Sequence, residues 1–343
     1  MKDVRALVDS VRQGNRLALG RLLTQVENDT EEGRQALVNL FPYTGSAHLI
    51  GVTGAPGTGK SSLVNRLAYH YRHLAEGTPA RRVGIIAVDP SSPFTGGAIL
   101  GDRVRMRDLT GDPGVFIRSM ASRGSLGGLA ATTSAVVDAV DAAGFDIILV
   151  ETVGAGQGEV DVASLAHTTL VVEAPGFGDD IQAIKAGILE IADILIINKA
   201  DLPGVENTER ALRGLLQLAH PTSHPLVGRF DDPVSRAGAS IHSGDLPWET
   251  PVLRTVATDG SGISDLVAEI DRHREYLQKS GGWTRQERAR LESQLDHLLK
   301  AELVSRWRKT VSESHVQSVV DRLANRELSP WQAVDMLLNG GRL

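Results

Sequence analysis

The stretch Gly54-Ala55-Pro56-Gly57-Thr58-Gly59-Lys60-Ser61 lies between an apolar run, Leu49–Val52, and a helical pattern that starts at Ser61. It matches the pattern G-x-x-x-x-G-K-[ST] in the strand–loop–helix setting that such phosphate-binding loops require. Glycines let backbone N–H groups curl around phosphates, and the following helix N-terminus adds positive potential. We therefore expect Lys60 to reach the β- and γ-phosphates and the Ser61 hydroxyl to bind Mg²⁺. The residues expected to contact the nucleotide are Gly54, Ala55, Pro56, Gly57, Thr58, Gly59, Lys60, Ser61 and Ser62.

From His48 onward, short apolar runs alternate with helical patterns. The runs are Leu49–Val52, Val83–Val88, Val115–Ile117, Ile147–Val150, Leu170–Val172, Ile194–Ile197 and Val252–Val256. The helical patterns are Ser61–Leu74, Leu126–Ala143, Ile181–Ile191, Thr208–Leu218 and Ile263–Leu277. This alternation predicts an α/β fold, a mostly parallel P-loop sheet covered by helices on both faces. Ligands of such sheets bind at the carboxyl ends of the strands.

Both ends of the chain have purely helical patterns. Apolar residues at three- and four-residue spacings predict two or three amphipathic helices within residues 2–42. After Ser280-Gly281-Gly282, a stripe of leucines marks further helices; it consists of Leu291, Leu295, Leu298 and Leu299. The stripe fits either packing on the main domain or a self-association arm. We expect a helical extension at residues 1–45, a P-loop sheet domain at 46–280 and a helical C-terminal arm at 281–343.

The composition narrows the class of protein. The chain has 343 residues and a net charge of −6, which argues against nucleic acid as the main partner because phosphate contacts need clustered basic residues. It has no cysteine, which excludes thiolate metal sites and cysteine nucleophiles. No apolar run is long enough to span a bilayer, and the N-terminus lacks the apolar core of a secretory signal. We expect a cytoplasmic protein with no membrane partner and no tightly bound organic cofactor, with an organellar matrix as the alternative.

A second motif, Asn198-Lys199-Ala200-Asp201, follows the apolar run Ile194–Ile197 and resembles the guanine-reading N-K-x-D motif. The Asp201 carboxylate can accept hydrogen bonds from both N1–H and the 2-amino group of guanine. Adenine offers neither pair of donors, so it would leave a buried acceptor unpaired. The motif therefore favours GTP over ATP, with a polar turn at a strand end as the alternative reading.

Three acidic residues are candidates for the metal side of the site. Glu151 ends the run Asp146–Glu151, where P-loop enzymes hold a Mg²⁺-side carboxylate. Many P-loop enzymes have Asp at this position, so we expect the contact of Glu151 with the metal to run through water. Asp89 ends another run, and Asp102 lies in the polar loop that follows it. Together with Ser61, these residues form the expected metal set, and the loop fits a mobile switch. Solvated strand-end acids and an ordinary surface loop are the alternatives.

Five segments together resemble the MeaB/ArgK/MMAA family of P-loop GTPases. They are Val88-Asp89-Pro90-Ser91-Ser92, Leu100-Gly101-Asp102-Arg103, Ser122-Arg123-Gly124-Ser125-Leu126-Gly127-Gly128, Ile148-Leu149-Val150-Glu151-Thr152-Val153-Gly154 and Gly178-Asp179-Asp180-Ile181-Gln182-Ala183-Ile184-Lys185-Ala186-Gly187-Ile188. The resemblance runs from about Leu49 to about Leu277. It implies a homodimeric G-protein chaperone that uses GTP to gate adenosylcobalamin loading into an acyl-CoA mutase, and to protect that mutase.

The resemblance also assigns residues. It implies that the segment Gly178–Lys185 is a partner-responsive switch carrying Asp179, Gln182 and Lys185, with Lys185 counted among the catalytic residues. Read without the resemblance, this segment is a helix start in which Asp179 and Asp180 complement the helix dipole.

The last guanine-contacting loop of the family usually reads Ser-Ala, whereas this chain has Val256-Ala257-Thr258. A backbone N–H contact to guanine survives that difference, but the hydroxyl contact at Val256 is lost, so we expect modest guanine affinity.

Two other functions compete with that of a regulatory GTPase. An ATP-dependent metabolic kinase would need an acceptor pocket and a base that the sequence does not clearly supply. Metal delivery fits poorly with absent cysteines and scattered histidines.

Overall fold

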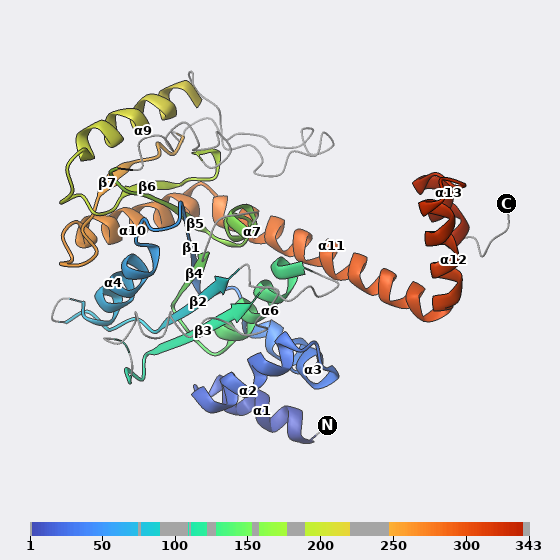
Figure 1. Cartoon of the computed structure of the whole chain (residues 1–343). Helices are drawn as coiled ribbons and strands as arrows, with labels where there is room; N and C mark the ends of the chain where they lie inside the picture. Colours follow the sequence, from blue (N-terminus) through green and yellow to red (C-terminus); the bar gives the residue numbers. More distant parts are fainter. Residues whose placement is uncertain are drawn as a thin grey trace.

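The computed structural model describes residues 2–74, 77–89, 109, 111–121, 128–152, 158–176, 189–219 and 247–338. Within these residues, seven strands form one parallel sheet in the order β3-β2-β4-β1-β5-β6-β7 (Figure 1). The strands are β1 His48–Thr53, β2 Val83–Asp89, β3 Val115–Ala121, β4 Ile147–Thr152, β5 Thr168–Glu173, β6 Ile194–Ile197 and β7 Val252–Arg254. The α/β fold predicted from the sequence is confirmed.

Both faces of the sheet are buried, which is why its strands are continuous apolar runs. Side chains alternate between faces, so Ile148 and Val150 pack in one core with α6 (Gly128–Ala142), whereas Leu149 lies in the other with α4 (Lys60–Arg72). The remaining covering helices are α7 Gly158–Leu165, α9 Val205–Ala219 and α10 Ile263–Lys279. The predicted helix Ile181–Ile191 lies mostly outside the described residues.

The last strand is shorter than the sequence predicts. The apolar run continues to Val256, but β7 ends at Arg254. Thr255 still donates its N–H to the carbonyl of Ile197, and the Val256 N–H then donates to the Ser261 carbonyl. The chain turns at Val256 because its amide is used to close a loop rather than to extend the ladder. Residues 255–262 therefore leave the sheet at its carboxyl edge. We call them the base loop, because they include the triplet 256–258 predicted to contact the nucleotide base.

Three helices form the N-terminal extension: α1 Lys2–Arg12, α2 Arg16–Glu27 and α3 Glu31–Leu40, followed by a short 3₁₀ turn at Phe41–Tyr43. The Asn15 side chain accepts N–H groups at the start of α2, and Thr30 does so at the start of α3. Leu19, Leu22 and Leu23 are buried in the core that α6 shares with the sheet. The extension is therefore packed onto the sheet domain through its apolar face.

The C-terminal part is a long helix, α11 (Gly282–Thr310), that carries α12 (Glu313–Ala324) and α13 (Pro330–Leu338) away from the sheet (Figure 1). Val319, Leu328 and Ala333 form a small separate core between the last two helices. Most of the predicted leucine stripe on α11 is exposed: Leu295 has 66% of its surface accessible, and Leu298 and Leu299 have 53%. No helix within the described segments has the length and apolarity needed to cross a bilayer.

One of the contacts that anchor α11 to the sheet domain is polar. Arg290, only 4% exposed, donates from Nη1 to Asp138 Oδ1 of α6 at 2.9 Å. Its Nη2 and Nε donate to the two carboxylate oxygens of Glu287 at 2.7 and 3.1 Å. The Gln294 amide donates to the other oxygen of Asp138 at 2.9 Å. Each buried charge therefore has a partner, as burial of charged groups requires.

Candidate functional site

The phosphate loop, residues 54–61, joins β1 to α4 at the carboxyl edge of the sheet. Gly54 has φ +135°, and a Cβ atom there would overlap with the carbonyl of Val172 on the neighbouring strand β5. Gly59 has φ +92° and directly precedes α4, where a Cβ atom would overlap with the Asn198 amide. Both positions therefore need glycine for its backbone conformation and for space.

Lys60 lies inside this loop. Its side chain is buried, and Nζ donates to the carbonyl oxygens of Gly54 at 2.7 Å and Ala55 at 3.0 Å. Thr58 is buried as well and donates its hydroxyl to Ala55, whereas Pro56 and Ser62 are not buried. The ammonium group is thus already held at the centre of the loop. A phosphate oxygen entering the loop would meet it together with the N-terminal N–H groups of α4.

Ser61 and Glu151, two of the residues predicted to bind Mg²⁺, are in contact beside the phosphate loop. The Ser61 hydroxyl donates to Glu151 Oε1 at 2.5 Å, and Glu151 is 1% exposed near the end of β4, next to β1. A hydroxyl and a carboxylate oxygen beside a phosphate loop are the donors that Mg²⁺ prefers. These two residues would hold the ion with the help of nucleotide phosphates. No group of three or more His, Asp or Glu side chains in the described part of the chain could hold a metal by itself.

The other predicted residues on this side are placed only in part. Asp89 is the last residue of β2, a neighbour of β4, so its backbone lies at the same carboxyl edge as Glu151. Asp102 lies outside the described residues, and so do the switch residues Asp179, Gln182 and Lys185.

Asn198 connects the guanine motif to the phosphate loop. It follows β6, is 1% exposed, and donates from Nδ2 to the carbonyl of Thr58 at 2.8 Å. Lys199 has φ +57° and donates from Nζ to the carbonyl of Gly57 at 2.7 Å. Asp201, the predicted guanine-binding carboxylate three residues after Asn198, is exposed. The motif and the phosphate loop, about 140 residues apart in the chain, form one site.

The base loop completes this arrangement. Asn198 Oδ1 accepts the N–H of Ala257 at 3.1 Å and the hydroxyl of Thr255 at 3.2 Å. Sequence reasoning named Val256, Ala257 and Thr258 but missed Thr255. Its position directly before that triplet was the signal that could have indicated it. The Asp259 carboxylate accepts the N–H of Ser261 at 2.8 Å, and hydrogen bonding from Ser261 lowers the pKa of Asp259.

Comparison with known proteins agrees with this geometry. Residues 19–312 match the family model described as "Methylmalonyl Co-A mutase-associated GTPase MeaB". The chain is 42% identical to a Pyrococcus abyssi protein named "Putative GTPase", over 97% of this chain and 95% of that one. It is 33% identical to "GTPase ArgK" of Escherichia coli, over 94% of each chain. It is 25% identical to the Caenorhabditis elegans "Methylmalonic aciduria type A homolog, mitochondrial", over 98% of this chain and 82% of that one.

A solved structure is also similar over nearly the whole chain. The crystal structure described as "LAO/AO transport system kinase" has a TM-score of 0.68 and 25% sequence identity, and the match covers 99% of this chain and 97% of that one. The phosphate loop, the guanine motif and these matches agree, and the chain therefore belongs to the family of methylmalonyl-CoA mutase-associated GTPases, MeaB, and hydrolyses GTP.

Proposed function

We propose that this GTPase gates the loading of adenosylcobalamin into an acyl-CoA mutase of the methylmalonyl-CoA mutase type, and protects that mutase. The single observation that carries the proposal is the match to a family described as mutase-associated, which covers residues 19–312. The name of the Caenorhabditis elegans relative points to the same metabolic context. We place the protein in the cytoplasm, as expected from the sequence.

The nucleotide would be held as follows. Lys60 would bind the β- and γ-phosphates, Asn198 would keep the base loop against the phosphate loop, and Asp201 would pair with guanine. Ser61, Asp89, Asp102 and Glu151 form the proposed metal set. Mg²⁺ bound there would neutralise phosphate charge. A positive charge near the β,γ-bridge would stabilise the transition state, and we assign that role to Lys185.

The proposed partner-responsive switch, residues 178–185, gives the test. Lys185→Ala should leave intrinsic hydrolysis nearly unchanged and blunt its acceleration by the mutase, because a charge supplied only in the complex acts like a trans-supplied arginine. Asp179→Ala should behave likewise if Asp179 positions the switch, which also includes Gln182. The measurement is steady-state GTP and ATP hydrolysis with and without a saturating cognate mutase. Equal stimulation of wild type and Lys185→Ala would refute the switch, and absence of any stimulation would refute the partner.

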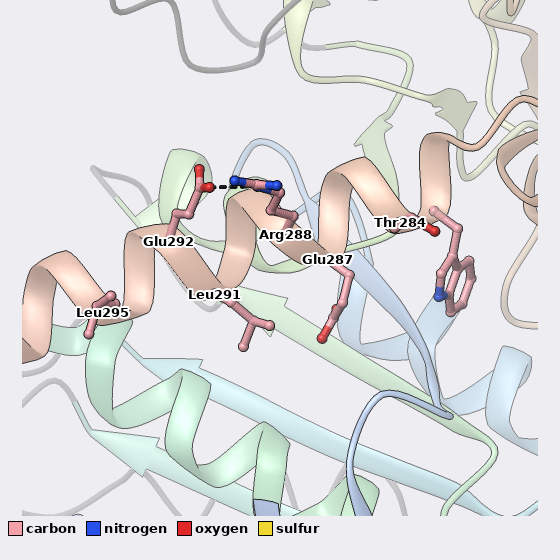
Figure 2. Close-up of a pocket in the computed structure, with 7 residues that line it drawn as sticks. Thr284, Glu287, Arg288, Leu291, Glu292 and Leu295 are labelled. Carbon is pink, nitrogen blue, oxygen red and sulfur yellow. Dashed lines mark hydrogen bonds and ion pairs between the residues drawn. The ribbon is translucent and has the colours of Figure 1, made fainter. Parts of the chain in front are cut away.

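We further propose a homodimer in which residues 281–343 form the dimerisation arm, residues 46–280 the GTPase domain and residues 1–45 the helical extension. The support is the exposed leucine surface of α11, which includes Leu295, Leu298 and Leu299. A shallow groove runs beside it, lined by Leu291 and Leu295 and bordered by the Arg288–Glu292 ion pair (Figure 2). Truncation after Gly281 should give monomers in light scattering. A dimeric mass for the truncated protein would show that the dimer interface lies outside the removed residues.

A further inference from the structure

Two adjacent carbonyl groups of the base loop are held by one side chain of the phosphate-loop helix. Arg66 of α4, which is half-buried, donates from Nε to the carbonyl of Ala257 at 3.1 Å. Its Nη2 donates to the carbonyl of Thr258 at 2.6 Å. The planar guanidinium presents donors in fixed directions, so it can hold two neighbouring carbonyls at once, which a lysine ammonium on a flexible stem does less well.

This contact fixes the direction of amide donors. In a trans peptide group the C=O and the following N–H point in opposite directions. Because the carbonyls of Ala257 and Thr258 point to Arg66, the N–H groups of Thr258 and Asp259 point away from it. The N–H of Ala257 is fixed separately by Asn198. Successive peptide groups of the base loop are thus oriented by two side chains from different elements.

Arg66 also joins the two halves of the nucleotide site. It lies six residues after Lys60 on the same helix, so the helix that receives phosphate at its N-terminus carries the base loop on its flank. Gly260, with φ +92°, packs on this side chain, since a Cβ atom there would lie 3.7 Å from Arg66 Cδ.

We propose that Arg66 is a positioning residue that determines specificity for guanine. It aims base-loop amides at the O6 carbonyl of the base. Adenine carries an amino donor at that position, and a donor aimed at a donor leaves both unpaired. This inference rests on GTP hydrolysis by the chain and does not depend on the mutase partner.

The test is competition binding of GDP, IDP and ADP to the full-length Arg66→Ala variant. The affinities for GDP and IDP should both fall roughly tenfold, the factor expected from losing hydrogen bonds to a charged donor in a half-buried position. The GDP-to-IDP ratio should stay constant, because it reports the 2-amino group at Asp201. ADP binding should change less than about twofold, since adenine has no acceptor at position 6. In GTP turnover the loss should appear in KM rather than in kcat, because Arg66 reaches the base loop.

Two further variants control the experiment. Arg66→Lys should lose an intermediate amount of affinity for GDP and IDP. This variant replaces Arg66→Ala in the test if Arg66→Ala does not fold. Arg213→Ala removes a half-exposed arginine on α9 whose partner Glu209 keeps its pair with Arg254, and it should bind like wild type. Unchanged GDP affinity in Arg66→Ala and Arg66→Lys would overturn the proposal. So would an equal loss for GDP and ADP, since that pattern is what a purely structural role produces.

Discussion

Replacing Arg290 by alanine tests how α11 is attached to the sheet domain. The substitution removes a guanidinium that pairs with Asp138 and Glu287, whose side chains are 7% and 20% exposed. It leaves two carboxylates close together without their shared cation. Breaking a buried pair by removing one partner costs about 3–5 kcal/mol, chiefly because the remaining charge is buried and unpaired.

The structure places the expected loss at the lower end of that range. Asp138 keeps the hydrogen bond from Gln294, and Glu287 keeps its contact with His167 Nε2 at 3.3 Å. Glu287 can also recover some hydration. We therefore expect a loss of about 3 kcal/mol in the free energy of unfolding, against about 0.5 kcal/mol or less for an exposed pair within a helix.

The assay is urea unfolding of the full chain followed by circular dichroism and tryptophan fluorescence. The fluorescence comes from four tryptophans, one of which, Trp283, stacks on His167 next to the pair. The matched control is Arg288→Ala, two residues earlier on α11, where the arginine is 81% exposed and pairs with Glu292. A loss below about 1 kcal/mol for Arg290→Ala, or equal losses for the two variants, would refute the anchoring argument.

Four further outcomes follow from the site and the anchor. Lys60→Ala should abolish GTP hydrolysis while circular dichroism stays native, because the ammonium that meets developing phosphate charge is gone; wild-type turnover would contradict the loop assignment. Asp201→Asn should weaken the binding of GTP and favour xanthosine nucleotides in competition binding, since an amide donor meets the extra carbonyl of xanthine. An unchanged preference for GTP would show that Asp201 does not contact the base. Gly54→Ala should lose GDP binding in calorimetry, because its Cβ would overlap with Val172 and displace the phosphate loop; binding at wild-type affinity would show that the loop adapts. The urea midpoint of unfolding should fall as the pH drops below about 6.5, because burial lowers the pKa of His167. It should fall again below about pH 4.5, because burial raises the pKa of Glu287 but hydrogen bonds from His167 and Arg290 outweigh this and lower it to about 2. In both cases the unfolded chain binds the proton more readily, so a flat profile would contradict this anchor.

Local sequence patterns determined the core of the site. The glycine spacing at residues 54–59, the lysine after it and the flanking apolar runs together specify a strand, a phosphate loop and a helix within about 25 residues. The guanine motif after Ile197 was readable for the same reason, because its spacing is short and its strand is fully apolar. Local propensity and periodicity act over such distances, so the sheet class could be derived without knowing the strand order.

Contacts between distant residues were decided only by the tertiary structure. Arg66 and Thr258 are 192 positions apart, and no periodic pattern marks either as a partner of the other. The leucine stripe on α11 fitted either packing on the main domain or self-association, and only the structure shows that Leu295 is exposed on this chain and that Arg290 is buried. An arginine ordinarily indicates a solvated position, and its burial is favourable only where the sheet order and helix packing bring Asp138 against it. The sequence predicted the local groups to which we assign the chemistry. Only packing decided which distant groups hold them in place, because the energy of those contacts exists only after the chain has folded.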